Sequence, residues 1–252
     1  GQSDAINKGW GRATGRFLAY LNSDDTYCPG AIVAAVNHLV RHPDIGMVYG
    51  DSNFIDERGG LLKVHNGRSM TIEDILCWSW HISQPTVFLH REAIDRVGMM
   101  NVDLNYAMDY DLWIRIAAQY QVLYLSAVLA NERHYPSSKT VAAPELGLKG
   151  RLQALERFFS CAHPPAIHAL KSMALATNCF KLSRYYLGMG NPAEARATAL
   201  KALKVRPPMR LVGSNMHLFA LGLVPTPRFG MWLRRSAGRF AKSANTYPYM
   251  SG

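Results

Sequence analysis

Two kinds of pattern divide this chain at about residue 140, and the division limits the folds that it can adopt. Up to about residue 135, short apolar runs of strand type alternate with stretches that carry apolar residues at helical spacing. From Pro144 onward the strand-type runs stop, and only helical stretches follow. Alternating strands and helices are typical of a sheet covered by helices, so we predict an α/β domain followed by an α-helical part.

The first part predicts a mixed sheet with helices on both faces. A helix over residues 4–16 leads into a short buried strand at residues 17–21. Two strands flank Arg58-Gly59-Gly60, which is a typical hairpin turn. The other predicted elements are helix 31–41, strand 45–50, hairpin strands 52–56 and 61–65, helix 71–77, strand 86–90, a helix from Glu92, helix 109–119, and strands 122–126 and 128–133.

The second part predicts three helices, at residues 145–161, 166–187 and 193–205. Residues 185–195 resemble part of one tetratricopeptide-type helix pair, but a solenoid needs about three such repeats. We therefore predict a helical appendix that has a packing role, with peptide binding as the alternative. The expected organisation is an α/β domain at 1–142, the appendix at 143–207 and a C-terminal tail at 208–252.

The positive charge of the chain is concentrated near its C-terminal end. The sequence holds 28 Lys and Arg against 18 Asp and Glu, and ten of the basic residues but no acid follow Glu194. The first 194 residues are therefore neutral, with 18 residues of each sign. Such a tail, with apolar stretches at 218–224 and 229–233, indicates binding to an anionic membrane surface. The alternative is that these stretches pack on the appendix, because Pro225 and Pro227 interrupt any long helix.

Several other classes of protein are not supported by the sequence. No run reaches the ~18 apolar residues of a membrane span, and we expect no secretory signal. The four cysteines form no CxxC pair, which argues against a zinc ribbon or a redox motif. The tail carries no recognition motif for nucleic acid, so we expect no nucleic-acid partner. We expect a cytoplasmic protein, peripheral on the inner face of the cytoplasmic membrane where the tail binds lipid.

Asp24 and Asp25 directly follow the first predicted strand. Ligands of α/β sheets gather at the carboxyl ends of strands, and adjacent acids there commonly hold a divalent cation against phosphate oxygens. Mg²⁺ and Mn²⁺ favour such hard oxygen ligands. The alternative is a solvated turn that caps the following helix.

Asp109 lies at the start of a predicted amphipathic helix. An acid at this position is stabilised by the helix dipole, and either Asp109 or Asp111 can serve as an N-cap. The functional alternative is a general base that removes a proton from an attacking hydroxyl group. A polar loop at residues 133–140, with His134 and Lys139, follows the last predicted strand and suits a diphosphate or a further metal contact.

Taken together and in order, these residues resemble the inverting family 2 glycosyltransferases of GT-A fold. The resemblance covers roughly residues 1–142, and several ordered motifs make it more specific than any one of them. Met108-Asp109 stands where the family has a Glu-Asp pair, with Asp109 at the position of the catalytic base. The other matching segments are residues 1–9, 21–25 (a DXD-type metal motif), 48–51, 82–88 and 133–140.

The resemblance implies a partial GT-A, Rossmann-like sheet and transfer of a sugar from a nucleotide-diphosphate sugar to an acceptor hydroxyl, with inversion. UDP-sugars are the expected donors, and a glycan or lipid-linked acceptor of polysaccharide or glycolipid biosynthesis is expected. Asp25 would hold Mg²⁺ or Mn²⁺, shared with Asp24 and His134. The other residues implied in substrate binding are Asp4, Asn7, Lys8 and Asp24 for the donor, His134 and Lys139 for the diphosphate, and Gln84 and Trp80 on the acceptor side.

Three departures from the family pattern bear on activity. Asn22 replaces the acid that often begins the metal motif, and Met108 replaces the glutamate of the pair. The family's opening strands, which hold the nucleotide base, have no counterpart, so we expect natural sequence upstream of Gly1. The alternative function is therefore a non-catalytic remnant that binds a partner or a membrane.

Overall fold

A computed structural model of the chain describes residues 1–78 and 81–205. Trp80 and the predicted tail at 208–252 lie outside the described residues. The chain divides into two compact units after Ala162, and each unit is described by itself.

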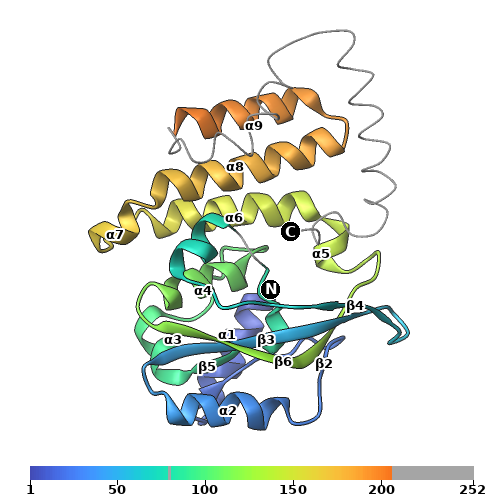
Figure 1. Cartoon of the computed structure of the whole chain (residues 1–252), viewed down its shortest axis with the longest axis vertical. Helices are drawn as coiled ribbons and strands as arrows, with labels where there is room; N and C mark the ends of the chain where they lie inside the picture. Colours follow the sequence, from blue (N-terminus) through green and yellow to red (C-terminus); the bar gives the residue numbers. More distant parts are fainter. Residues whose placement is uncertain (79–80, 206–252) are drawn as a thin grey trace. The chain divides into compact units, whose positions relative to one another are not determined.

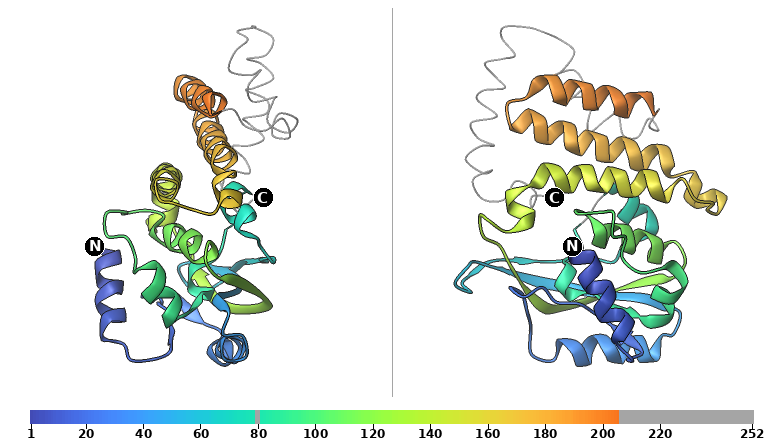
Figure 2. Two further views of the ribbon diagram at one scale, coloured as in Figure 1. Left: turned by 90° about the vertical axis from the view of Figure 1, so that its left-hand side faces the viewer. Right: turned by 180° about the vertical axis from the view of Figure 1, so that it is seen from behind.

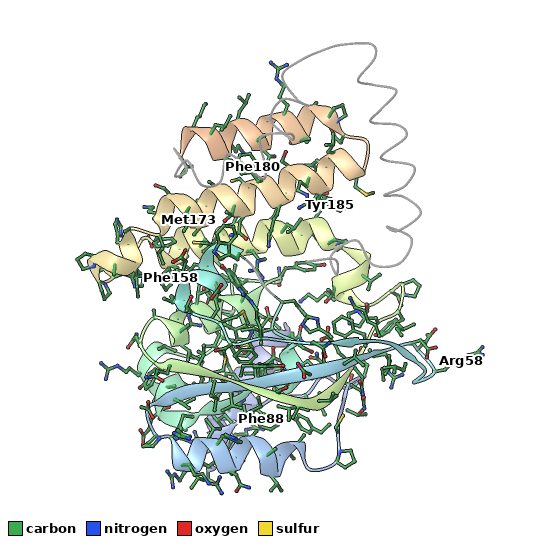
Figure 3. All side chains as sticks on the ribbon, viewed as in Figure 1. Arg58, Phe88, Phe158, Met173, Phe180 and Tyr185 are labelled. Atoms are coloured by element: carbon green, nitrogen blue, oxygen red, sulfur yellow. The ribbon has the colours of Figure 1, made fainter. Side chains whose placement is uncertain are left out.

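The first unit is built on a six-stranded mixed sheet in the order β1-β5-β3-β6-β2, with β4 also paired to β3 (Figure 1). Its two long strands, β3 and β6, run parallel, and every other pairing is antiparallel. The predicted hairpin around Gly59 is formed by β3 and β4, and Arg58 lies at its tip (Figure 3). The strands are β1 (Phe17–Leu18), β2 (Thr26–Tyr27), β3 (Ile45–Ile55), β4 (Leu61–His65), β5 (Phe88–His90) and β6 (Gln121–Arg133).

Helices cover both faces of this sheet (Figures 1 and 2). On one face, α2 (Ala31–Arg41) places residues at i, i+4 and i+8 against the strands, because these positions share one side of a helix. Phe88 lies between the sheet and α2 (Figure 3). On the other face, α4 (Met108–Ala117) buries Leu112 and Ile116 completely. The predicted α/β class, with a mixed sheet and helices on both faces, is confirmed.

The remaining elements of the first unit surround α4 and the sheet. Helix α6 packs on α4, and the first unit therefore extends through it to Ala162 rather than to the expected residue 142. Gly150 is required at this contact, because a Cβ atom there would lie 2.7 Å from the backbone oxygen of Tyr106. The other helices are α1 (Gln2–Arg12), α3 (Arg91–Val97), α5 (Lys139–Ala142), α6 (Pro144–Phe158), the π-helix η1 (Asp74–Trp78) and the 3₁₀-helix η2 (Gln84–Thr86).

In the second unit, α8 (Lys171–Gly188) and α9 (Pro192–Lys204) form an antiparallel helix pair after the short helix α7 (Pro165–His168) (Figure 1). Gly190 has φ +73°, a left-handed conformation that favours glycine and ends α8. The side chain of Asn191 then accepts a hydrogen bond from the backbone N–H of Glu194, which caps α9. The tetratricopeptide likeness of this pair stays a prediction. Within the described residues, no helix combines the length and apolar character needed to cross a membrane.

Candidate active site

The paired acids lie in a turn between β1 and β2, and Asp25 is almost completely buried there, with 7% of its surface exposed. Its Oδ1 atom accepts a hydrogen bond from the backbone N–H of Arg133 (2.8 Å), and its Oδ2 atom accepts one from Asn22 Nδ2 (3.0 Å). Burial raises the pKa of Asp25 to about 6, and the two hydrogen bonds act in the opposite direction. Asp25 is therefore held by protein groups at both oxygens.

Arg133, at the end of β6, fixes this turn through its side chain as well. Its Nε donates to the backbone oxygen of Asp24 (2.8 Å), and its Nη1 donates to the backbone oxygens of Asp56 (2.8 Å) and Glu57 (3.0 Å). The carboxylate of Asp24 is only half-buried and accepts a hydrogen bond from Tyr135 (3.0 Å). Asp24 is thus the more accessible of the two acids.

A chain of amide side chains joins the turn to three other segments. Asn22 Nδ2 donates to Gln84 Oε1 (2.9 Å), and Gln84 Nε2 donates to the backbone oxygen of Tyr20 (2.8 Å). On the other side, Gln2 Nε2 donates to Asn22 Oδ1 (2.9 Å), and Lys139 Nζ donates to Gln2 Oε1 (3.4 Å). The helix α1, the acidic turn, η2 and the loop after β6 therefore meet at Asn22. Gln84, expected on the acceptor side, uses both ends of its amide within this network.

Asp109 lies in the first turn of α4 and is half-buried. The helix is not capped by an acid: its N-cap is Ala107, in a left-handed conformation with φ +57°. Asp109 Oδ1 accepts a hydrogen bond from the backbone N–H of Tyr110 (2.8 Å), whereas Asp111 pairs with Arg115 (2.9 Å). The alternative that Asp109 or Asp111 serves as the N-cap is therefore wrong. Met108, in place of the family's glutamate, accepts a hydrogen bond from the buried Ser3.

Electrostatic effects on two neighbouring groups indicate that Asp109 lies near the turn. Burial, with the negative charges of Asp109, Asp25 and Glu132, raises the pKa of Tyr20 well above its ordinary value. Loss of solvent lowers the pKa of Lys139, and the charge of Asp109 opposes this effect. Coulomb interactions of this kind require the groups to be close together. The predicted acids Asp25 and Asp109 therefore both lie near Tyr20, and Asp109 also lies near Lys139.

His134 takes a different partner from the one that was expected. It is buried, with 3% of its surface exposed, and its Nε2 lies 3.1 Å from Glu132 Oε1. Among the residues that the structure describes, no three His, Cys, Asp or Glu side chains form a group that could hold a metal ion. The expected trio of Asp24, Asp25 and His134 is thus not assembled.

The predicted donor-binding residues of α1 contact one another or the neighbouring loop. Asp4 and Lys8 form an exposed ion pair one turn apart (2.8 Å). Asn7 donates to the backbone oxygen of Met100 (2.8 Å) and accepts from its N–H (3.0 Å), so its amide fastens α1 to this loop. Sequence reasoning missed Gln2 and Glu132 as parts of the site, although Glu132 is an acid at the end of a predicted strand, the same signal that indicated Asp24.

The comparisons with known proteins point to a glycosyltransferase. The model of the family described as glycosyl transferase family 2 matches residues 1–98, which include the acidic turn, Gln84 and strands β1 to β5. This match and the similar proteins described next support a family 2 glycosyltransferase. The chain is 25% identical over 120 residues to the uncharacterized glycosyltransferase MJ1057 of Methanocaldococcus jannaschii, covering 47% of the chain and 41% of that protein.

A second relative and two solved structures extend the likeness. The uncharacterized protein y4gI of Sinorhizobium fredii is 30% identical over 160 residues, which cover 61% of the chain and 17% of that protein. The chain therefore spans less than half the length of these curated relatives. Staphylococcus aureus TarS 1–349 shares the fold at a TM-score of 0.54, with 13% identity, covering 98% of this chain and 72% of that one. The mannosyltransferase PcManGT of Pyrobaculum calidifontis aligns with a TM-score of 0.50 and 18% identity, covering 99% of this chain and 67% of that one. Its structure contains GDP-Man and Mn²⁺.

Proposed function

We propose that this protein transfers a sugar from a nucleotide-diphosphate sugar to an acceptor hydroxyl group, with a divalent cation and with inversion. The observation that carries the proposal is that Asp25 and Asp109 both act on Tyr20, with Lys139 near Asp109, in a chain whose residues 1–98 match family 2. A related fold that binds GDP-Man and Mn²⁺ supports a nucleotide-sugar donor and a divalent metal. We propose UDP-sugars first and GDP-sugars second as donors.

The residues of the turn fit a hard cation such as Mg²⁺ or Mn²⁺, because their donor atoms are carboxylate oxygens. Asp24 is the residue that would hold the ion, since its carboxylate is half-buried while both oxygens of Asp25 already accept protein hydrogen bonds. A single acid suffices, because Mg²⁺ commonly completes its shell with water and substrate phosphates. When bound, the ion would neutralise the diphosphate leaving group.

The chain's own residues perform the other tasks of the proposed reaction. Lys139, an exposed cation bound to Gln2, would attract the diphosphate to the loop after β6. Asp109 would take the proton of the acceptor hydroxyl, which then attacks the anomeric carbon from the face opposite the diphosphate. A single displacement of this kind inverts the anomeric centre.

A donor screen of the longest in-frame form of the protein tests the proposal, with Mn²⁺ and a panel of UDP- and GDP-sugars. Asp109→Asn is expected to retain nucleotide binding and to lose transfer by ~10²-fold or more, the usual size of a general-base contribution. Asp95→Asn, at an exposed position of α3, is the matched control. If nucleotide binding falls in step with transfer in Asp109→Asn, the role of Asp109 as a base is refuted.

The basic sequence after Glu194 favours a second candidate function, binding to a partner or a membrane without catalysis. We propose an anionic membrane surface as the ligand, which also suits a lipid-linked glycan acceptor at the inner face of the cytoplasmic membrane. Co-sedimentation with anionic and with neutral vesicles compares the chain with a version that stops after Pro208. Equal sedimentation of the two versions would refute membrane binding by the tail.

A further inference from the structure

Glu132, near the end of β6, is the common acceptor of a polar cluster that the proposed reaction does not use. Its Oε1 lies 3.1 Å from His134 Nε2, and its Oε2 lies 3.5 Å from His81 Nε2. The hydroxyl group of Ser83 donates a hydrogen bond to the same Oε2 atom. Three polar side chains therefore converge on one carboxylate that is mostly buried, with 13% of its side chain exposed.

The two residues next to this cluster in the sequence are the ones that hold the acidic turn. Arg133, next to Glu132, donates its backbone N–H to Asp25 Oδ1 (2.8 Å). Gln84, next to Ser83, accepts a hydrogen bond from Asn22 (2.9 Å). Because Asn22 also donates to Asp25 (3.0 Å), these contacts form a closed ring. The ring runs through Asn22, Asp25, Arg133, Glu132, Ser83 and Gln84, and back to Asn22.

We propose that Glu132 is a positioning residue of the active site, which fixes the acidic turn by tying the segment 81–84 to the end of β6. Opening the ring at the contact between Glu132 and Ser83 leaves Gln84 and Arg133 without a common support. The turn then loses its fixed position relative to Asp109. The expected effect on catalysis rests on the proposed function, whereas the hydrogen-bonded ring can be tested without it.

The carboxylate of Glu132 is needed because of its charge and its number of acceptor sites. Burial alone would raise the pKa of Glu132, but the hydrogen bonds from His134 and His81 hold it far below its ordinary value. An ionised carboxylate accepts several hydrogen bonds at its two oxygens, whereas a glutamine of the same shape presents one oxygen and one N–H₂ donor. In Glu132→Gln, therefore, at least one of the three donors faces another donor.

Hydrogen exchange in the full chain tests the ring without any assay of activity. In Glu132→Gln, and in Ser83→Ala, we expect the backbone amides of Asp25 and Arg133 to exchange about tenfold faster, as the loss of one hydrogen bond to a charged group would produce. Glu92→Gln, at an exposed position of α3, is the control and should leave both amides unchanged. Unchanged exchange in both variants at the ring would overturn the proposal. If Glu132→Gln does not fold, the exchange rates of Ser83→Ala alone still test the ring, because this substitution removes only the hydroxyl group that donates to Glu132.

Kinetics then separate a positioning role from a general loss of stability. With a donor that the unsubstituted protein turns over, Glu132→Gln should raise the KM for the nucleotide sugar or lower kcat by at least about tenfold, at a temperature where it remains folded. The double variant with Ser83→Ala should add little to this effect, because both changes open the same contact. If the effects of the two substitutions on kcat or KM instead add, the proposal of a closed ring is refuted. If no donor is turned over by any variant, the proposed function fails, and the exchange result still tests the ring.

Discussion

Asp25→Asn is the substitution for which the structure gives the clearest dependence on pH. Asp25 lies in the interior, and burial raises its pKa from 3.8 to about 6. A raised pKa means that the folded state binds the proton more tightly than the unfolded state does. The stability that Asp25 contributes is therefore fully present below pH 3.8 and is lost as the pH rises through 6. An asparagine at this position stays neutral throughout and removes the dependence.

The size of the effect follows from the shift of about two pKa units. At 1.36 kcal/mol per unit, the ionised carboxylate costs about 3 kcal/mol of unfolding free energy at neutral pH. About 2 kcal/mol of this falls between pH 4.5 and pH 7.5. Any hydrogen bond that the asparagine side chain fails to make lowers the stability at both pH values equally, so it cancels from the difference.

Urea unfolding of the two proteins at pH 4.5 and at pH 7.5, with a chelator present, measures this difference. Asp25→Asn should gain about 2 kcal/mol relative to the unsubstituted protein on going to the higher pH. Asp44→Asn, at an exposed loop position, serves as the control for a change of net charge. A difference between Asp25→Asn and the unsubstituted protein that is the same at both pH values would refute the assigned burial of the charge.

Four further substitutions test the contacts around the turn and the packing of α6. Asn22→Asp replaces the amide that donates to Asp25 with an acceptor, so urea unfolding should show a loss of about 1.5–3 kcal/mol. Arg133→Lys removes the planar guanidinium group that donates to three backbone oxygens, and the KM for the donor should rise by roughly tenfold. An unchanged KM would refute the role of these contacts in fixing the turn. Gly150→Ala should lower stability by about 1–3 kcal/mol because its Cβ meets the backbone of Tyr106. Gly147→Ala, on the same helix with open space around it, should instead raise stability by about 0.5–1 kcal/mol, and thermal unfolding compares the two.

Local sequence patterns predicted the elements whose ends are set by their own residues. Helix α2 occupies residues 31–41 as predicted, because Gly30 permits the left-handed conformation before it and Pro43 follows its end. The patterns did less well where pairing decides the length of a strand. Only Phe17 and Leu18 of the predicted strand 17–21 pair with β5, so β1 is shorter than its apolar run.

Pairing also joined two strands that the sequence separates. The predicted strands 122–126 and 128–133 are one strand, β6, because its register against β3 shifts between Leu125 and Val128 and then continues. The residues of β3 that pair with β6 lie 75 to 78 positions earlier, and no local pattern encodes that distance. The helix predicted over residues 4–16 ends at Arg12 for a related reason, since residues 13–16 lead into β1.

Asn22 shows why the site was only partly predictable. In the sequence it is only a departure from an acidic motif. In the structure its amide donates to Asp25 and to Gln84 and accepts from Gln2, three roles that a carboxylate cannot fill together because it has no N–H. Gln84 lies 62 residues away along the chain, so this requirement becomes visible only when the fold brings the segments together. The acids of the site were predictable because their chemistry is carried by residue type, whereas the residues that hold them depend on partners that are distant in the sequence.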